Sequence, residues 1–200
     1  QVRGIASADS WATDAHKWLN VPYDSGLAIV ADTAPLRAAM GMKASYLQRG
    51  NDEERIGMDW TPESSRRARV VPLYALFRAL GRDGIAGLVR RTCALARRMA
   101  ERLSAAPGLT ILNEVVLNQV LVRFGDDRTT TDVIARVQAE GTCWAGGAFW
   151  QGQQAMRIAV SNWSTTEADI DRSADAMLGC YRAALATSSS PAPSSGPAPG

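Results

Sequence analysis

The succession of apolar segments in residues 109–186 constrains the fold more than any other feature of the sequence. Strand-like runs at 109–112, 120–124, 143–150 and 155–160 are interspersed with helical segments at 131–140 and 166–186. Thr165 or Thr166, with acidic residues directly after it, is a suitable N-cap for the last helix. Strands joined in this order by short connections predict a small α+β domain built on an antiparallel sheet.

A long helical pattern precedes this domain. From residue 65 to residue 106, apolar residues recur at three- and four-residue steps, with a break at 81–84. Two helices or one kinked helix are therefore expected, and Pro107-Gly108 ends the pattern. An arginine cluster at its start could bind an anion, but a solvated or salt-bridged helix start is favoured. The cluster consists of Arg66, Arg67 and Arg69.

The N-terminal part is predicted to hold two short strands around a turn. Residues 5–8 lead into the turn and the apolar run 27–31 leads out of it, which is typical of a strand covered on both faces. A short helix is expected at 33–42, and a long loop at 48–62 that could act as a lid. Residues 187–200 contain only Ala, Thr, Ser, Pro and Gly, which predicts a disordered tail.

Composition excludes several classes of function. A net charge of +2, with basic and acidic residues dispersed, gives no basic block for a nucleic-acid partner. Three widely spaced cysteines indicate neither a disulfide framework nor a metal site, so reduced thiols and a cytoplasmic location are expected. The sequence has neither an apolar run of about 18 residues for a membrane span nor a leading signal segment. Because the chain begins with Gln, we expect a processed chain or a fragment.

The turn between the two predicted N-terminal strands contains the candidate catalytic residues. Of the 22 basic residues only Lys17 and Lys43 are lysines, and Lys17 follows the single histidine, His16. A partly buried amine with a lowered pKa is a nucleophile for carbonyl groups, and its strongest use is a Schiff base. The alternative is an ordinary surface lysine, which is the commoner case for an isolated Lys.

Several ordered segments resemble the group II pyridoxal-phosphate-dependent amino-acid decarboxylases, which include the aromatic amino-acid, histidine and glutamate decarboxylases. The resemblance covers about residues 1–186. It is carried by Asp9-Ser10, Asp14-Ala15-His16-Lys17-Trp18-Leu19, Tyr23-Asp24, Gly26, Tyr46-Leu47, Ser65-Arg66-Arg67, Leu80-Gly81-Arg82-Asp83-Gly84, Met156-Arg157-Ile158 and Asn162-Trp163-Ser164-Thr165-Thr166.

The resemblance implies an α/β fold of the fold type I pyridoxal-phosphate enzymes, with the end of the large domain at 1–106 and the small C-terminal α+β domain at 107–186. Lys17 would then carry the cofactor pyridoxal 5'-phosphate, with His16 and Asp14 near its phosphate. Tyr46 would be the loop tyrosine that returns a proton to the substrate carbon after decarboxylation. A homodimer is implied as well.

In this family, the Asp that pairs with the pyridine nitrogen, the His that stacks on the ring and the segment that cradles the phosphate all lie more than 16 residues before the lysine. The 200 residues alone are therefore expected to bind the cofactor weakly and to decarboxylate little. Two alternatives remain: an inactive truncated remnant or dimerisation partner, and a fold type I aminotransferase. Trp144, Phe149 and Trp150 could belong to the core or to a pocket, and an aromatic or related amino acid is the favoured substrate.

Overall fold

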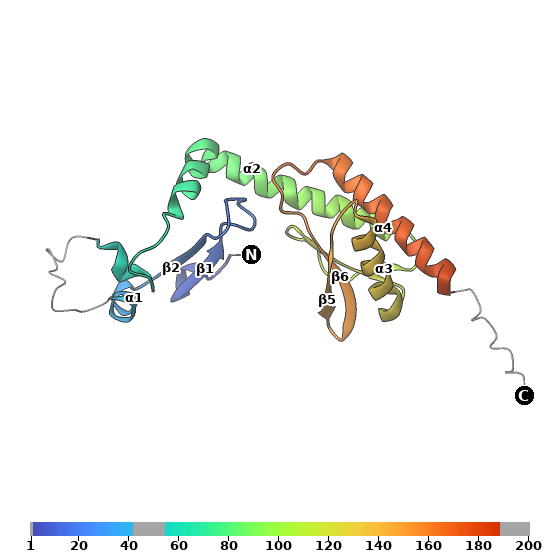
Figure 1. Ribbon diagram of the computed structural model, residues 1–200, viewed down its shortest axis with the longest axis horizontal. Helices are drawn as coiled ribbons and strands as arrows, with labels where there is room; N and C mark the ends of the chain where they lie inside the picture. Colours follow the sequence, from blue (N-terminus) through green and yellow to red (C-terminus); the bar gives the residue numbers. More distant parts are fainter. Residues whose placement is uncertain (1, 42–54, 189–200) are drawn as a thin grey trace, which may run out of the picture. The chain divides into compact units, whose positions relative to one another are not determined.

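The computed structural model describes residues 2–41 and 55–188, which belong to two compact units, residues 1–81 and 82–200 (Figure 1). The first unit contains η1 (Ile5–Ser7), β1 (Ser10–Asp14), β2 (Gly26–Val30), α1 (Thr33–Met40), η2 (Gly57–Trp60) and the first turns of α2 (Val70–Ser104). The second contains the rest of α2, followed by β3 (Leu109–Ile111), β4 (Gln119–Phe124), α3 (Asp127–Glu140), β5 (Gly146–Trp150), β6 (Gln153–Ala159) and α4 (Glu167–Ser188).

An antiparallel hairpin frames the lysine turn in the first unit. Its register runs from the pair Ser10 and Val30 to the pair Asp14 and Gly26. The turn between the strands is anchored by a small cluster in which Ala15 and Val21 pack with Leu73 of α2, all three buried. The hairpin and the first turns of α2 therefore hold the turn from two sides.

Two predictions for this hairpin need correction. Residues 5–7 form the short helical turn η1 rather than the start of a strand, because Gly4 has a positive φ of 85° and its carbonyl accepts a hydrogen bond from the Ser7 N–H at 2.9 Å. The outgoing strand is present, but it is not covered on both faces by the described residues, since Ile29 is 38% exposed. In the described part of the chain, each strand of this sheet has one neighbour.

Helix α2 has the predicted break, at a single residue. Gly81 has φ 60° and ψ −173°, which is far from helical geometry, and the helix resumes at once with Arg82. Glycine tolerates this backbone conformation because it lacks a Cβ atom. The unit boundary at Gly81 therefore coincides with the break in apolar periodicity, while the predicted domain boundary after residue 106 stays a prediction.

The second unit is the predicted antiparallel sheet with helices packed on it. The strand order is β3-β4-β6-β5, and Val120 pairs with Ile158 while Val122 pairs with Met156. These side chains are buried in one core with residues of α2, α3 and α4. Phe124, at the end of β4, is also fully buried there.

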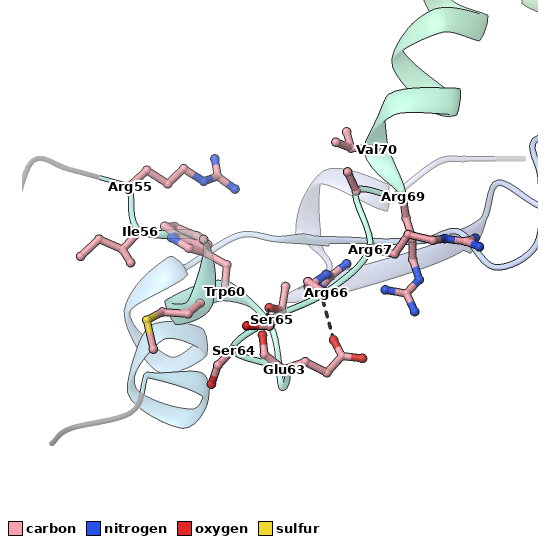
Figure 2. A pocket seen from close by; sticks show the side chains of 14 residues that line it. Arg55, Ile56, Trp60, Glu63, Ser64, Ser65, Arg66, Arg67, Arg69 and Val70 are labelled. Carbon is pink, nitrogen blue, oxygen red and sulfur yellow. Dashed lines mark hydrogen bonds and ion pairs between the residues drawn. The ribbon is translucent and has the colours of Figure 1, made fainter. Parts of the chain in front are cut away.

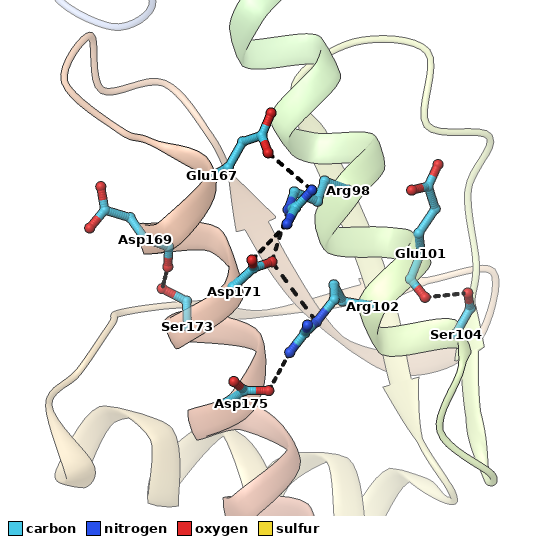
Figure 3. A network of polar contacts seen from close by, with 9 residues as sticks. All are labelled: Arg98, Glu101, Arg102, Ser104, Glu167, Asp169, Asp171, Ser173 and Asp175. Carbon is cyan, nitrogen blue, oxygen red and sulfur yellow. Dashed lines mark hydrogen bonds and ion pairs between the residues drawn. The ribbon is translucent and has the colours of Figure 1, made fainter.

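Helices α2 and α4 are joined by a ladder of ion pairs along their length (Figure 3). Arg98 contacts Glu167 at 3.1 Å and Asp171 at 2.7 Å. Arg102 continues the ladder with Asp171 and with Asp175. The helices that cover the sheet are thus tied to each other as well as to the core.

Local side-chain hydrogen bonds decide where the helices of this unit begin. Helix α3 begins four residues earlier than predicted, because the Asp126 carboxylate accepts a hydrogen bond from the Thr129 N–H at 2.8 Å and caps the first turn. Of the two predicted N-caps of α4, Thr166 takes the role: its hydroxyl accepts from the Asp169 N–H at 3.3 Å, and the Asp169 carboxylate accepts from the Thr166 N–H at 2.9 Å. Helix α4 extends to Ser188, and the remainder of the predicted tail lies outside the described residues.

Three aromatic side chains lie at the surface of the second unit, although the sequence predicted that they belong either to the core or to a pocket. Trp144 and Phe149 are 76% and 73% exposed, and Trp150 is 43% exposed. The prediction that these residues belong to the core is therefore wrong for the described residues.

Among the helices in the described residues, none has the length and apolar character needed to cross a membrane.

Candidate active site

The candidate site is the turn between β1 and β2. Two backbone hydrogen bonds close the base of this turn. One runs from the Ala15 N–H to the Ser25 carbonyl at 2.8 Å, and the other from the Val21 N–H to the Ala15 carbonyl at 3.4 Å. With Ala15 and Val21 buried, the residues between them are held at a fixed place on the surface. Asp14, His16 and Lys17, the predicted site residues of this segment, therefore lie together on one rigid turn.

Lys17 and Asp14 form an ion pair. The Lys17 Nζ lies 2.6 Å from the Asp14 Oδ2, and the side chains are 70% and 42% exposed. The hydrogen bond from Lys17, together with its positive charge, holds the pKa of the Asp14 carboxyl below its ordinary value. Lys17 is thus neither a buried amine nor an isolated surface charge, and its amine can be reached from solvent.

His16 is oriented by its neighbours. The Ser25 N–H donates a hydrogen bond to the His16 Nδ1 at 2.9 Å. The His16 ring also packs on Tyr23, with ring centroids 4.0 Å apart. The same Nδ1 lies 3.1 Å from the Ser25 carbonyl oxygen, so both backbone polar groups of Ser25 face this ring nitrogen and the tautomer decides which of the two bonds forms.

Arginines that lie more than forty residues later in the sequence support the turn. The Arg67 Nη2 donates to the Tyr23 carbonyl at 2.7 Å, and the Arg69 Nε donates to the Asp24 Oδ1 at 2.7 Å. The bond from Arg69 holds the pKa of the Asp24 carboxyl below its ordinary value. The prediction that the arginine cluster is salt-bridged is confirmed. Its contact with the turn was not predicted, because the spacing of residues along the chain does not show which distant residues meet in the fold.

A surface cavity of about 740 Å³ is lined in part by these arginines, and its 14 lining residues all come from the segment between Arg55 and Val70 (Figure 2). Arg55 stacks over the Trp60 ring at 4.2 Å, and Arg66 contacts Glu63 at 3.6 Å. The arginine side chains that line it thus already have partners within the first unit. Tyr46, the predicted proton donor, lies outside the described residues, so its role stays a prediction.

The C-terminal segments that carry part of the resemblance have structural roles in the second unit. Met156 and Ile158 are buried in the core, whereas Arg157 is exposed on the other face of β6. The Asn162 carboxamide accepts a hydrogen bond from the Ser164 N–H at 2.9 Å, and Arg91 of α2 donates to the Trp163 carbonyl. The loop before α4 is therefore fastened to α2.

The residues of the turn fit the part of pyridoxal phosphate that the sequence predicts them to hold. The Lys17 amine can be reached by an aldehyde, and in the tautomer whose Nδ1 accepts from the Ser25 N–H, the Nε2–H of His16 is a donor for a phosphate oxygen. Among the described residues, no group of three His, Cys, Asp or Glu side chains could hold a metal ion.

Comparison with known proteins decides the family. The model described as "Pyridoxal-dependent decarboxylase conserved domain" matches residues 1–124, which include the whole lysine turn. This chain belongs to the pyridoxal-dependent decarboxylase family. The predicted family is therefore confirmed, and so is its cofactor, pyridoxal phosphate.

Similar curated proteins include a histidine decarboxylase of Drosophila melanogaster, 27% identical over 171 residues that make up 84% of this chain and 20% of the relative. An aromatic-L-amino-acid decarboxylase of Rattus norvegicus is 25% identical over 142 residues, 69% of this chain and 30% of the relative. This member of the family thus spans less than a third of the length of either relative.

Solved structures show the fold. The Oryza sativa TDC with PLP and tryptamine matches with a TM-score of 0.85 at 18% identity, over 91% of this chain and 40% of that chain. The Catharanthus roseus tryptophan decarboxylase in complex with L-tryptophan matches with a TM-score of 0.80 at 19% identity, over 91% of this chain and 39% of that chain. The predicted fold type I architecture is confirmed by these similarities.

Proposed function

We propose that this chain is part of an enzyme that decarboxylates an L-amino acid with pyridoxal phosphate, and that Lys17 is the residue to which the cofactor attaches. The observation that supports this most is the position of Lys17: an accessible amine on a rigid turn, inside the segment that matches the family. Similarity to the curated decarboxylases supports the reaction class.

Each residue of the turn has a distinct proposed task. Lys17 supplies the amine that binds the cofactor aldehyde covalently. His16, whose Nδ1 lies against the backbone of Ser25, donates its Nε2 proton to a phosphate oxygen. Asp14 lies beside both, in the place where the resemblance puts it near the phosphate. When bound, pyridoxal phosphate supplies an electron sink for the electron pair that remains after carbon dioxide departs.

Tyr46 is proposed to return a proton to the substrate carbon. The resemblance implies that a tyrosine here favours simple decarboxylation, whereas a phenylalanine favours oxidative deamination. The expected product is therefore the amine, and formation of the aldehyde would argue against this role.

We further propose an aromatic or related amino acid as substrate, a homodimer as the assembly and the cytoplasm as the location.

The attachment site is tested with the chain itself. Pyridoxal phosphate is added, the adduct is reduced with borohydride, and the modified peptide is identified by mass spectrometry. Since the chain has two lysines, Lys17→Ala and Lys43→Ala form a matched pair. Modification and the visible absorbance band should be lost in Lys17→Ala and kept in Lys43→Ala. Equal labelling of both lysines would contradict the proposal.

We also propose that these 200 residues alone hold the cofactor weakly and release little carbon dioxide from a panel of amino acids. The reason is that a single covalent bond and one phosphate donor leave the cofactor ring without the other partners that the family uses. A tight, stable and Lys17-dependent absorbance band would overturn this expectation. If carbon dioxide release is absent even from a longer protein that contains this chain, the remnant or dimerisation role is favoured instead.

A further inference from the structure

The ion pair between Lys17 and Asp14 opposes the chemistry proposed for Lys17. An amine attacks an aldehyde only as the neutral base, whereas a carboxylate 2.6 Å from the Nζ stabilises the ammonium. The turn itself sets this contact, because the Lys17 N–H donates to the Asp14 carbonyl at 3.2 Å and so places the two side chains one turn apart.

The hairpin leaves room for the Asp14 carboxylate. Asp14 is the last residue of β1 and pairs with Gly26, the first residue of β2. A Cβ atom at position 26 would lie 3.7 Å from the Asp14 Oδ1, in ordinary van der Waals contact. The carboxylate therefore fits beside position 26 without a steric conflict, and its other oxygen, Oδ2, faces Lys17.

We propose that Asp14 is a positioning residue that holds Lys17 as its ammonium in the cofactor-free protein, so that the ion pair must open before the cofactor attaches. This inference rests on the proposed function of Lys17. It assigns Asp14 a role in the cofactor-free protein, in addition to the place near the phosphate that the resemblance implies.

The covalent step shows why the ion pair matters. The Lys17 ammonium first releases one proton to solvent. The lone pair of the Nζ then forms a bond to the aldehyde carbon, and the two remaining amine hydrogens leave with the aldehyde oxygen as water. Asp14 favours the state before the first proton is released, and in this way it lowers the fraction of reactive amine at neutral pH.

Other charged and titratable groups surround the turn. His16 and Tyr23 belong to it, and the positive field of a charged His16 also lowers the pKa of Asp14. Asp24, Arg67 and Arg69 form a group of their own, in which the Asp24 carboxylate contacts both guanidinium groups. The Asp14 carboxylate differs from Asp24 in that its ion pair is with Lys17.

The experiment compares Asp14→Asn with Asp9→Asn. Both variants remove one carboxylate from the same hairpin region, but Asp9 lies five residues before Asp14, about 16 Å away in an extended chain and beyond the Debye length. Trace labelling of the amines with acetic anhydride over a pH series measures the fraction of neutral Lys17, with Lys43 as the internal reference. The rate of borohydride-trapped attachment of pyridoxal phosphate at Lys17 is measured in parallel.

In Asp14→Asn, labelling and cofactor attachment at Lys17 should both accelerate about two- to fivefold at pH 8, as expected for loss of a partly exposed ion pair. The difference from wild type should shrink as the pH rises through the range in which a lysine amine loses its proton, ordinarily about 10.4. Asp9→Asn should behave like wild type.

An unchanged or slower rate of both reactions in Asp14→Asn, or the same acceleration in Asp9→Asn, would overturn the inference. Faster labelling without faster attachment would overturn the claim that the ion pair limits attachment. Failure of the proposed function gives a different result: the anhydride labelling still responds to Asp14→Asn, but pyridoxal phosphate shows no preference for Lys17 over Lys43.

Discussion

Arg98 of α2 binds Asp171 of α4 through two parallel hydrogen bonds, from Nε to Oδ1 at 2.8 Å and from Nη2 to Oδ2 at 2.7 Å. The planar guanidinium matches the carboxylate in this geometry, which a lysine cannot reproduce. The contact joins residues 73 positions apart in the sequence and sits at the centre of the ladder in Figure 3.

Replacing Arg98 with Ala should lower the melting temperature of the second unit by about 2–4 °C, since a two-bond ion pair at a half-exposed position contributes modestly to stability. Arg97→Ala is the matched control, because the adjacent Arg97 is exposed on the same helix. Thermal unfolding followed by circular dichroism measures both. Equal melting temperatures for the two variants would show that the contact contributes nothing.

The same contact should make stability depend on pH. Arg98 holds the pKa of the Asp171 carboxyl below its ordinary value of 3.8, so folding favours the ionised form. The stabilisation is therefore complete well above that value and is lost as the pH falls through the lowered pKa. The gap in melting temperature between wild type and Asp171→Asn should be largest near neutral pH and shrink below about pH 4. A gap that grows with acidity would contradict this sign.

Gly108 should tolerate alanine much less well than Gly141, although both have a positive φ, 82° and 85°. A Cβ atom at position 108 would overlap with the Tyr181 hydroxyl, whereas nothing lies within 4 Å of the corresponding atom at position 141. Both substitutions carry the cost of a left-handed backbone, about 1–2 kcal/mol, and Gly108→Ala carries an additional steric cost.

Denaturant unfolding of the two variants gives the two free energies. In a Tyr181→Phe background the steric cost should disappear, so that Gly108→Ala and Gly141→Ala become similar. If Gly108→Ala costs no more than Gly141→Ala with Tyr181 in place, the overlap is relieved by a small movement of the tyrosine and the explanation fails.

His16 should carry its proton on Nε2 when the ring is neutral. Nδ1 lies 2.9 Å from the Ser25 nitrogen and 3.1 Å from the Ser25 carbonyl oxygen, and the shorter contact favours the form in which Nδ1 accepts the hydrogen bond. Because the chain contains one histidine, ¹⁵N-detected correlation spectra of the ring need no assignment by mutagenesis. The Nδ1 resonance should be that of an unprotonated nitrogen, and a spectrum dominated by the Nδ1–H form would contradict the proposed donation to phosphate.

Much of the candidate site was accessible from the sequence. The scarcity of lysine singled out Lys17, and the surrounding segment carried the family resemblance. The ion pair with Asp14 was not predicted, because a spacing of three residues brings two side chains together only if the turn between them is helical. The use of Ser25 to orient His16 was missed for a similar reason, since a backbone N–H has no side-chain signature.

From α2 onward, the sequence by itself determined the order of helices and strands, because apolar periodicity and capping residues act over a few neighbours. The break at Gly81 could be predicted there, and Thr166 was one of two predicted caps. Only the tertiary structure decided which distant charges meet. Arg69 with Asp24 and Arg98 with Asp171 are pairs chosen by how the hairpin, α2 and α4 pack, and packing depends on the whole chain rather than on local pattern. Lys17 could therefore be singled out from the sequence, whereas its ion pair with Asp14, which stabilises the protonated amine, could not.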